Sequence, residues 1–598
     1  MEKTEFSTGQ PNEPPTGKPK WRWYQAGSCS LFATMMSCVL FGNLPLRYIS
    51  SLTTVHAADV ALPADVTPAA QPTGDWKQWG GSSRRNNTPE GRNIPTEWNI
   101  GEFDEAGEWQ RKDSKNIKWA ARLGSVTHST PVVANGKVFI GTNNALGRVK
   151  RYPADVDLSC LQCFDEATGK FLWQDSNEKL AMGRSQDWPD TGIVTTPLVE
   201  GKRLWYVTNR GHVRCLDVEG FRDGVNDGPF REEPNENLDE ADVIWSVDMI
   251  KDWGVFPHNQ CTCSLTSLGD VLLVCTSNGV NESHVKIPNP KAPSFVALDK
   301  TTGKLLWQDN SPGENILHGT WASPAADVID GIPQAIFGGG DGWVYSFDVR
   351  GDNGKSKLLW RFDANPKASK YVLGGHATRN PIVCAPVIHD AKVYVCVGDD
   401  PEHGEGIGHL YCIDATKRGD ISDELVVRRD DPTKTPLEHR RYRAVDESKG
   451  EIAIANPNSG MIWHYDHRDN NGDGQIQFEE TMHRSLGSVA IKNGLLFVAD
   501  FGGVLHCLDA KTGKVHWTHN LKTGFWGSPL IVEDRVYIGD ENGTVTIFRL
   551  SDKKELIKAI EYHNSIFTTL IVANNVLYVT TKDYLFAIAA EPAKETAK

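Results

Sequence analysis

The chain has 598 residues, of which 39% are apolar, 9% aromatic and 23% charged, and its formal net charge is −14. It is therefore long and apolar enough to bury a large core. Nucleic-acid binding needs clustered Lys and Arg to neutralise phosphates, and an acidic chain without a basic block excludes that class of partner.

Residues 1–58 are predicted to direct export. A polar, Pro-rich start ends in basic residues, and the segment from Ala26 to Leu46 carries no charge. Small residues near Ala58 offer a cleavage site, although they lie further beyond the apolar run than in a compact signal peptide. A cleaved export signal and a retained membrane anchor both remain open. In either case the rest of the chain is extracytoplasmic, in the periplasm or cell envelope, and residues 59–75 are expected to form a flexible leader.

A repeated unit runs through residues 76–598. In its clearest copy an apolar run ends at Asp509, an Asp-x-x-Thr-Gly-Lys turn follows, and a second run ends at Trp517. This pattern indicates strand, tight turn and strand, and a second hairpin precedes it, so each repeat holds four strands. Four short strands recurring every 40 to 50 residues or so predict a propeller, because one small sheet cannot bury both faces alone.

Eight copies predict an all-β fold, an eight-bladed β-propeller of four-stranded antiparallel blades. The anchor residues of the copies are Asp165, Asp217, Asp299, Asp348, Asp414, Asp509, Arg549 and Ala589. The last copy lacks its fourth strand, whereas residues 116–122 resemble a Trp strand with no repeat before it. We expect this N-terminal strand to pair with the last blade and close the ring, which removes exposed sheet edges.

Ten of the twelve Cys follow the leader. Four of them lie two residues before an anchor, where other copies have Ala or Ser: Cys163, Cys215, Cys412 and Cys507. They are predicted to be small core residues in different blades, too far apart to form disulfides.

Residues 415–482 are predicted to be an insertion in blade five that contains an EF-hand-like loop at 469–480. Calcium takes six to eight oxygen ligands, and the loop offers six residues: Asp469, Asn471, Asp473, Gln475 through its carbonyl, Gln477 through a water, and Glu480 with two oxygens. We expect a structural Ca²⁺ ion here, preceded by a strand rather than a helix. The alternative is an Asn- and Gly-rich turn without metal.

Several histidines precede blades at similar places in the repeat. His258, His318 and His483 are equivalent, His563 is one residue away, and His376 and His128 lie nearby. Equivalent positions form a ring at the channel mouth, where imidazoles bind a metal or an anionic ligand, or take protons. The alternative is that they are polar, partly packed loop residues. The acidic turns 399–403 and 540–541 are expected to be solvated turn tips.

The Ala-x-Asp-x-x-Thr-Gly-Lys-x-x-Trp pattern resembles the tryptophan-docking repeat of the pyrroloquinoline-quinone (PQQ)-like propellers over residues 76–590. That family includes quinoprotein dehydrogenases and BamB-type envelope proteins without a cofactor, and the fold alone does not choose between them. For a dehydrogenase the resemblance implies PQQ over the channel, Ca²⁺, an Asp base, Arg for the PQQ carboxylates and, in the alcohol-oxidising branch, a disulfide between adjacent Cys. This sequence has no adjacent Cys pair and no Cys-x-x-Cys-His haem motif.

We therefore expect an exported, non-catalytic, BamB-like scaffold of the cell envelope that binds a protein or other envelope partner, and that is membrane-anchored if its N-terminal segment is retained. The alternative is a PQQ- and Ca²⁺-dependent quinoprotein that oxidises an alcohol or a sugar. A third hypothesis is a hydrolase or metal site on the histidine ring.

Overall fold

The computed structural model describes residues 74–373, 377–399 and 403–590. The predicted export segment, the leader up to residue 73 and His376 lie outside these ranges. Within them, none of the helices has the length and apolar character needed to span a bilayer. In the described ranges the single α-helix is α1 (Met249–Trp253), and the other helical segments are short 3₁₀ turns such as η3 (Gly313–Asn315) and η6 (Phe478–Glu480).

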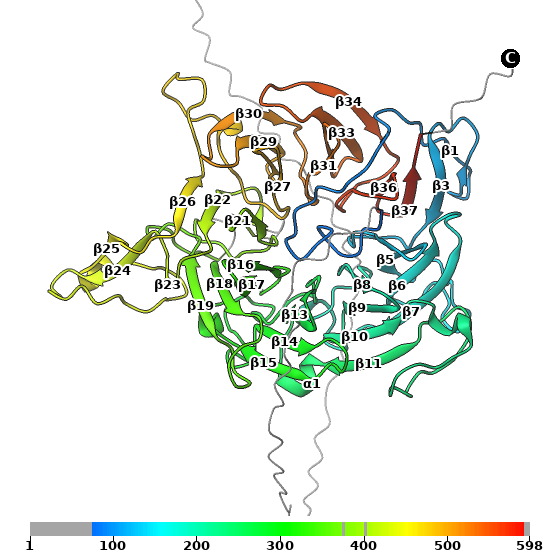
Figure 1. Ribbon diagram of the computed structural model, residues 1–598, viewed down its shortest axis with the longest axis horizontal. Coiled ribbons are helices and arrows are strands. Elements are labelled where there is room, and N and C mark those ends of the chain that lie inside the picture. Colours follow the sequence, from blue (N-terminus) through cyan, green and yellow to red (C-terminus); the bar gives the residue numbers. More distant parts are fainter. Residues whose placement is uncertain (1–73, 374–376, 400–402, 591–598) are drawn as a thin grey trace, which may run out of the picture. The chain divides into compact units, whose positions relative to one another are not determined.

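Eight four-stranded antiparallel sheets form the blades, which follow one another around a ring, as predicted (Figure 1). Blades one to four are β4 (Val132–Ala134), β5 (Lys137–Asn143), β6 (Leu158–Asp165), β7 (Phe171–Glu178); β8 (Leu198–Glu200), β9 (Arg203–Val207), β10 (His212–Asp217), β11 (Val243–Asp248); β12 (Thr266–Leu268), β13 (Val271–Cys275), β14 (Phe295–Asp299), β15 (Leu305–Asp309); and β16 (Ala325–Ile329), β17 (Ile332–Gly338), β18 (Trp343–Asp348), β19 (Leu358–Asp363).

Blades five to seven are β20 (Val387–His389), β21 (Lys392–Val397), β22 (His409–Asp414), β26 (Met461–Tyr465); β27 (Ala490–Lys492), β28 (Leu495–Ala499), β29 (Val504–Asp509), β30 (Val515–Asn520); and β31 (Leu530–Val532), β32 (Arg535–Gly539), β33 (Thr544–Arg549), β34 (Leu556–Glu561). The six predicted Asp anchors each end the third strand of their blade, where the Asp side chain fixes the turn, whereas Arg549 ends β33 and Ala589 follows the last residue of β37. Asp509 Oδ1, for example, accepts hydrogen bonds from the N–H and the hydroxyl of Thr512.

The eighth blade confirms the predicted closure of the ring. It consists of β35 (Ile571–Ala573), β36 (Val576–Thr580), β37 (Tyr584–Ile588) and, from the N-terminal side, β3 (Ile117–Arg122), which pairs antiparallel with β37. The short hairpin β1 (Glu102–Phe103) and β2 (Trp109–Gln110) precedes β3. The two ends of the propeller are thus held in one sheet, and the last blade has no open edge on that side.

Each repeat Trp docks on the next blade. The indole N–H of Trp173 donates to the carbonyl of Val218 at 3.1 Å, and that of Trp463 donates to Ala510 at 3.1 Å. The turn glycine lies under the ring: a Cβ placed on Gly513 would be 2.6 Å from Trp463. Close approach, together with a φ of +70° at Gly513, explains why the repeat carries Gly in this turn.

A second set of bonds between blades surrounds the channel and was not predicted. At six of the eight junctions a backbone N–H donates to the hydroxyl at the equivalent position of the following blade, at 2.9–3.3 Å: Thr130 to Thr196, Thr196 to Ser264, Ser264 to Ser323, Ser488 to Ser528, Ser528 to Thr569 and Thr569 to Thr130. Blade five has Ala385 there, and Ser488 donates to the Ala385 carbonyl instead. Buried N–H groups are costly when unpaired, so this ring stabilises the assembled blades.

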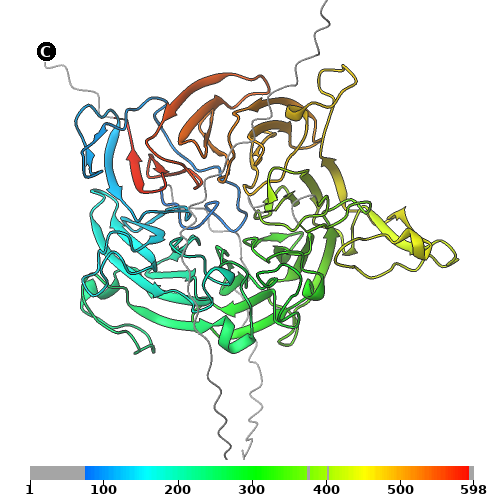
Figure 2. The ribbon, with the colours of Figure 1, turned by 180° about the vertical axis from the view of Figure 1, so that it is seen from behind.

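Residues 76–87, which we call the channel segment, cross the middle of the ring (dark blue in Figures 1 and 2) and touch every blade. Backbone bonds join the segment to the inner strands of five blades, and the side chains of Gln78, Asn86 and Asn87 reach blades three, six and eight. Arg85 is only 1% exposed and donates to the carbonyls of Pro324, Ser264 and Trp79. Burial lowers the pKa of Arg85 to about 9.

The channel segment lies toward one end of the channel. Gly74, just before it, accepts from the N–H of Asn574, and Arg92, just after it, donates to Asn575. These two Asn form the turn between the first and second strands of blade eight. In an antiparallel blade the connections between blades lie at the opposite end. The predicted histidines, which precede the blades, are therefore at the end away from this segment.

The segment 415–482 divides into two parts. Residues 415–460 leave blade five, add β23 (Gly419–Asp420) in parallel to β19 of blade four, and form a hairpin of β24 (Glu424–Arg428) and β25 (Glu451–Ala455) that projects from the ring (Figure 1). The chain then returns as β26, the fourth strand of blade five. The predicted calcium loop follows β26 and so connects blades five and six.

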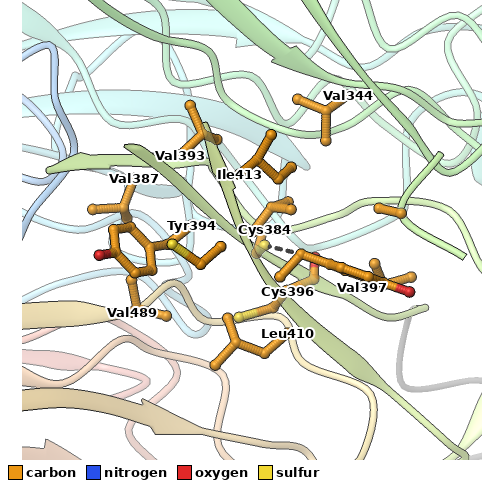
Figure 3. Packing of buried hydrophobic residues seen from close by; sticks show 14 of the residues in the cluster. Val344, Cys384, Val387, Val393, Tyr394, Cys396, Val397, Leu410, Ile413 and Val489 are labelled. Carbon is orange, nitrogen blue, oxygen red and sulfur yellow. Dashed lines mark hydrogen bonds between the residues drawn. The ribbon is translucent and has the colours of Figure 1, made fainter. Parts of the chain in front are cut away.

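All ten cysteines in the described ranges are buried and free. Cys384 and Cys396 lie in the core around blade five, where the Cys384 thiol donates to the carbonyl of Cys396 at 3.1 Å (Figure 3). The four Cys at the repeat position likewise belong to the blade cores, which confirms that they fill space between sheets.

Candidate functional site

Four histidines and one aspartate meet where loops of blades three, four and five converge. His258 precedes β12, His284 lies between β13 and β14, His318 precedes β16, and Asp399 and His403 lie between β21 and β22. The ring centroids of His258 and His318 are 4.5 Å apart, those of His284 and His318 4.6 Å, and those of His318 and His403 5.0 Å. We call this group the histidine cluster.

Hydrogen bonds orient the imidazoles of the cluster. His258 Nδ1 is 2.8 Å from the carbonyl oxygen of Val280, and His258 Nε2 is 3.1 Å from His284 Nε2. His318 Nδ1 is 3.1 Å from Asp399 Oδ1, and His403 Nδ1 is 3.6 Å from Asp399 Oδ2. Asp399 therefore links His318 to His403. His318 belongs to the group of three that it forms with His258 and His284, and His403 lies beside that group.

Burial sets the protonation of the cluster. His258 and His318 are fully buried, and Asp399 is 2% exposed. Burial lowers the pKa of His258 to about 2, assisted by the neighbouring His318 and His284, so its imidazole is neutral. Burial opposes ionisation of Asp399, but the hydrogen bond and charge of His318, with His403 and Arg484, keep its pKa below the ordinary value. The cluster thus combines a neutral imidazole at His258 with a carboxylate at Asp399.

The surroundings fix the loops that carry the cluster. The indole of Trp321 stacks on His258 at 5.7 Å, and its N–H donates to the carbonyl of His258. The buried guanidinium of Arg484 donates to the carbonyls of His403 and Ala377. From the insertion, Arg441 donates to the carbonyls of Val285 and His284.

The structure brings together only two of the histidines predicted from the repeat, His258 and His318. His483 instead bonds Asp500, with Nδ1 2.9 Å from Oδ2, and His506 bonds the same carboxylate. His563 is paired with Asp583 at 2.8 Å. A continuous ring does not form because each of these histidines has an acidic partner in its own blade.

His128 lies in an aromatic group rather than beside the other histidines. Its imidazole stacks on Phe567 at 4.9 Å and contacts Trp526 at 5.4 Å. Burial lowers the pKa of His128 to about 4, with a smaller contribution from Lys582.

Three residues of the cluster were missed by sequence reasoning: His284, His403 and Asp399. The expectation of a solvated turn at 399–403 is wrong for Asp399, which is buried because it accepts a hydrogen bond from His318. Asp540 is also buried, at 3% exposed, where it accepts the N–H of Thr544 and closes its turn. His284 lies in the loop between β13 and β14, and the corresponding loops of the other blades differ from it in length, so no repeat signal could have found it.

The loop 469–480 turns its first and last carboxylates inward. Asp469 accepts the N–H groups of Gly472, Asp473 and Gly474. Glu480, 6% exposed, accepts those of Asn470, Asn471 and Gln477. The strand β26 precedes the loop, as expected, and the three-residue turn η6 forms the last residues of the loop. The donor set consists of oxygens, the ligand type that calcium prefers.

The sequence is similar to known proteins over part of its length. A family model described as outer membrane protein assembly factor BamB matches residues 448–556. The outer membrane protein assembly factor BamB of Yersinia pestis is 22% identical over 356 residues, which cover 52% of this chain and 78% of that protein. A lupanine 17-hydroxylase [cytochrome c] of a Pseudomonas species is 26% identical over 248 residues, 38% of this chain and 33% of the hydroxylase, so the chain spans a third of that relative.

Solved structures with a similar arrangement are more distant in sequence. BamB from Moraxella catarrhalis is 14% identical, with a TM-score of 0.44 over 80% of this chain and 98% of BamB. A quinohemoprotein alcohol dehydrogenase from Pseudomonas putida is 12% identical, with a TM-score of 0.49 over 88% of this chain and 82% of the dehydrogenase.

Proposed function

Starting from its membership of the PQQ-like β-propeller family, we propose that this protein is an exported, non-catalytic scaffold of the cell envelope that binds a protein partner. The name of its Yersinia pestis relative, outer membrane protein assembly factor BamB, supports an envelope role. We also propose that the propeller lies outside the cytoplasm, in agreement with the apolar N-terminal segment. The dehydrogenase relatives supply the alternative, a quinoprotein that carries PQQ.

The observation that carries the proposal is the state of the guanidinium groups near the histidine cluster. PQQ has three carboxylates, and bidentate Arg is the side chain best suited to bind them. Here Arg441 and Arg484 donate to protein carbonyls, and Arg379 pairs with the buried Asp363 at 3.0 Å. Binding PQQ through Arg441, Arg484 or Arg379 would require these bonds to break, which supports the scaffold proposal.

The projecting hairpin β24–β25 supports an interaction role. It stands away from the ring (Figure 1). The loop that joins its strands returns to the propeller, where Tyr442 stacks on Tyr371 and remains 44% exposed. Exposed aromatic and Arg side chains are enriched in protein interfaces. The hairpin is anchored at its base, where Asn456 donates to the carbonyl of Ser422, so the surface can be held in place for a partner.

Reconstitution tests this function. The full-length protein is incubated with PQQ and Ca²⁺, dialysed, and examined for PQQ absorbance and for dye reduction with alcohols and sugars. The scaffold proposal expects neither signal. Stoichiometric PQQ retained after dialysis, with substrate-dependent dye reduction, would establish the quinoprotein alternative. Cross-linking in envelope preparations, with a variant whose residues 430–436 are replaced by a short Gly-Ser linker, then tests whether the hairpin contacts the partner.

We further propose that the loop 469–480 binds a structural Ca²⁺ ion through Asp469, Asn471, Asp473, Gln475, Gln477 and Glu480. Its support is the oxygen donor set and the inward orientation of Glu480, which accepts three backbone N–H groups of the loop. Because the loop joins blades five and six, the bound ion would tie β26 to the start of blade six, and it requires no catalytic role.

A further inference from the structure

The histidine cluster has the geometry of a metal centre, which the names of the similar proteins do not suggest. We propose that His258, His284 and His318, with His403 beside them, bind one divalent ion of the imidazole-preferring class, such as Zn²⁺. One ligand nitrogen from each of His258, His284 and His318 lies within 4.8 Å of the other two. This inference is independent of the scaffold function, because a metal that only joins loops serves a binding protein as well as an enzyme.

The hydrogen bonds place the lone pairs where a metal needs them. A carbonyl and a carboxylate only accept hydrogen bonds, so His258 and His318 must each carry their proton on Nδ1. The Nε2 atom of each ring then holds the lone pair. The Asp399 carboxylate accepts the hydrogen bond of His318 Nδ1, and His318 Nε2 is the atom that would bind the metal. This arrangement matches the carboxylate–histidine–metal triad, which orients metal ligands and raises their basicity.

The spacing also suits a small metal ion. His258 Nε2 and His284 Nε2 are 3.1 Å apart. Two nitrogens bound to tetrahedral zinc at about 2.0–2.1 Å lie about 3.3 Å from each other. The imidazoles of His258 and His284 would therefore need almost no movement relative to each other to bind one ion. A hydrogen bond from the N–H of His284 to the lone pair of His258 Nε2 explains this distance equally well. The experiment below must therefore distinguish a metal centre from a hydrogen-bonded pair of histidines.

Charge favours the metal. The cluster is enclosed, with His258 and His318 fully buried. Neutral imidazole is the form that coordinates Zn²⁺, Cu²⁺ or Co²⁺, whereas Ca²⁺ and Mg²⁺ prefer oxygen ligands. The Asp399 carboxylate provides a negative charge that offsets part of the ion's charge, and the ion of this centre differs in class from that of the loop 469–480.

The centre would join three blades and the insertion. Its ligands come from the loop before blade three, a loop within blade three, the loop before blade four and a loop within blade five. Arg441 of the insertion bonds the backbone of the His284 loop. Metal binding would therefore order the loops that form this face of the propeller, and the side chain of His284, which is only partly buried, gives the ion a route from solvent.

The test uses the full-length protein stripped with a chelator and reloaded with Zn²⁺ or Co²⁺. We expect one ion per chain by elemental analysis, and with Co²⁺ the d–d absorption of a nitrogen-rich, four- or five-coordinate site. His284→Ala, at the most accessible position, should lose the ion and the spectrum. Asp399→Asn keeps the ligands but weakens their orientation, so affinity should fall 10- to 100-fold.

The matched control is His464→Ala, which disrupts the other close histidine pair, His409 and His464, 3.1 Å apart on blade five. It should leave the stoichiometry and the Co²⁺ spectrum unchanged. The proposal is overturned if the wild-type protein binds no ion, if the Co²⁺ spectrum shows only oxygen ligands, or if His464→Ala rather than His284→Ala abolishes binding. Because the Co²⁺ spectrum is recorded on wild-type protein, it decides the question even if a variant fails to fold.

Discussion

Trp119 and Gly169 are in direct contact across the junction that closes the ring. A Cβ placed on Gly169 would lie 2.6 Å from the indole, and Trp119 Nε1 donates to the neighbouring carbonyl of Glu166 at 2.9 Å. Trp119 belongs to β3, far in sequence from the rest of blade eight, yet it docks on blade one as Trp173 and Trp463 dock on their following blades. The closing strand therefore contributes more than backbone pairing to the ring.

Gly169→Ala is expected to destabilise the protein by about 2 to 4 kcal/mol. The substitution adds a methyl group against Trp119 and places Ala at a φ of +72°, and overpacking and backbone strain each cost about 1 to 2 kcal/mol. Denaturant unfolding measures the loss. The matched control is Gly136→Ala in the same blade, with a φ of +73° and nothing within 4 Å of the new Cβ. Equal losses in both variants would show that the contact with Trp119 contributes nothing.

Ser528→Ala is expected to cost about 1 to 3 kcal/mol, because it leaves the buried N–H of Ser488 without its acceptor. Hydrogen exchange offers a local readout, in which the Ser488 amide should exchange faster than in the wild type. Thr301→Ala, on an exposed turn, serves as the control and should leave the free energy of unfolding within about 0.5 kcal/mol of the wild type. Unchanged exchange at Ser488 would mean that water replaces the lost hydroxyl.

The blade architecture could be predicted because every repeat encodes the same four-stranded blade. The anchor Asp, the turn Gly and the docking Trp recur at fixed spacing, and even the orphan strand around Trp119 was recognisable as the missing fourth strand of blade eight. The residues that bond neighbouring blades around the channel also recur, as the Ser or Thr before the first strand of most blades. A single Ser or Thr in a loop, however, does not indicate from the sequence that its hydroxyl will bond the neighbouring blade.

The histidine cluster could be predicted only in part, because most of its members are not repeated. His258 and His318 share a repeat position, which drew attention to them, whereas His284 and His403 lie in loops of irregular length. Two residues at equivalent positions of the repeat are predicted to lie at the same end of the channel. It does not say which will be neighbours, since His483 has the same position and yet bonds Asp500.

Asp363 is expected to make the protein sensitive to acid. Arg379 and Lys367 pair with it at 3.0 and 2.8 Å. Burial opposes ionisation of Asp363, but these two cations lower its pKa to about 2. The folded-state pKa is thus below the unfolded value of about 3.9, so the stabilisation is complete above pH 4 or so and is lost as the pH falls toward 2.

Urea unfolding at pH 7 and pH 3 measures this effect. Asp363→Asn should cost about 3 to 5 kcal/mol at pH 7, since it leaves Arg379 and Lys367 buried without a counter-charge. The difference in stability between wild type and variant should shrink by about 1 kcal/mol or more at pH 3, because the wild-type carboxylate then becomes partly protonated on unfolding. A difference that stays constant between the two pH values would show that Asp363 does not titrate in this range.

Glu480→Gln is expected to abolish calcium binding by the loop 469–480. Glu480 is the ligand that would provide two carboxylate oxygens, and the amide removes both its negative charge and one oxygen. Isothermal calorimetry should show one Ca²⁺ site in the wild type and no binding heat in the variant. The adjacent Glu479→Gln is the control, because Glu479 accepts from Asn520 at 3.0 Å outside the loop and should retain the wild-type affinity. Binding that survives Glu480→Gln, or that disappears with Glu479→Gln, would mean that the ion sits elsewhere or that this segment is a turn without metal.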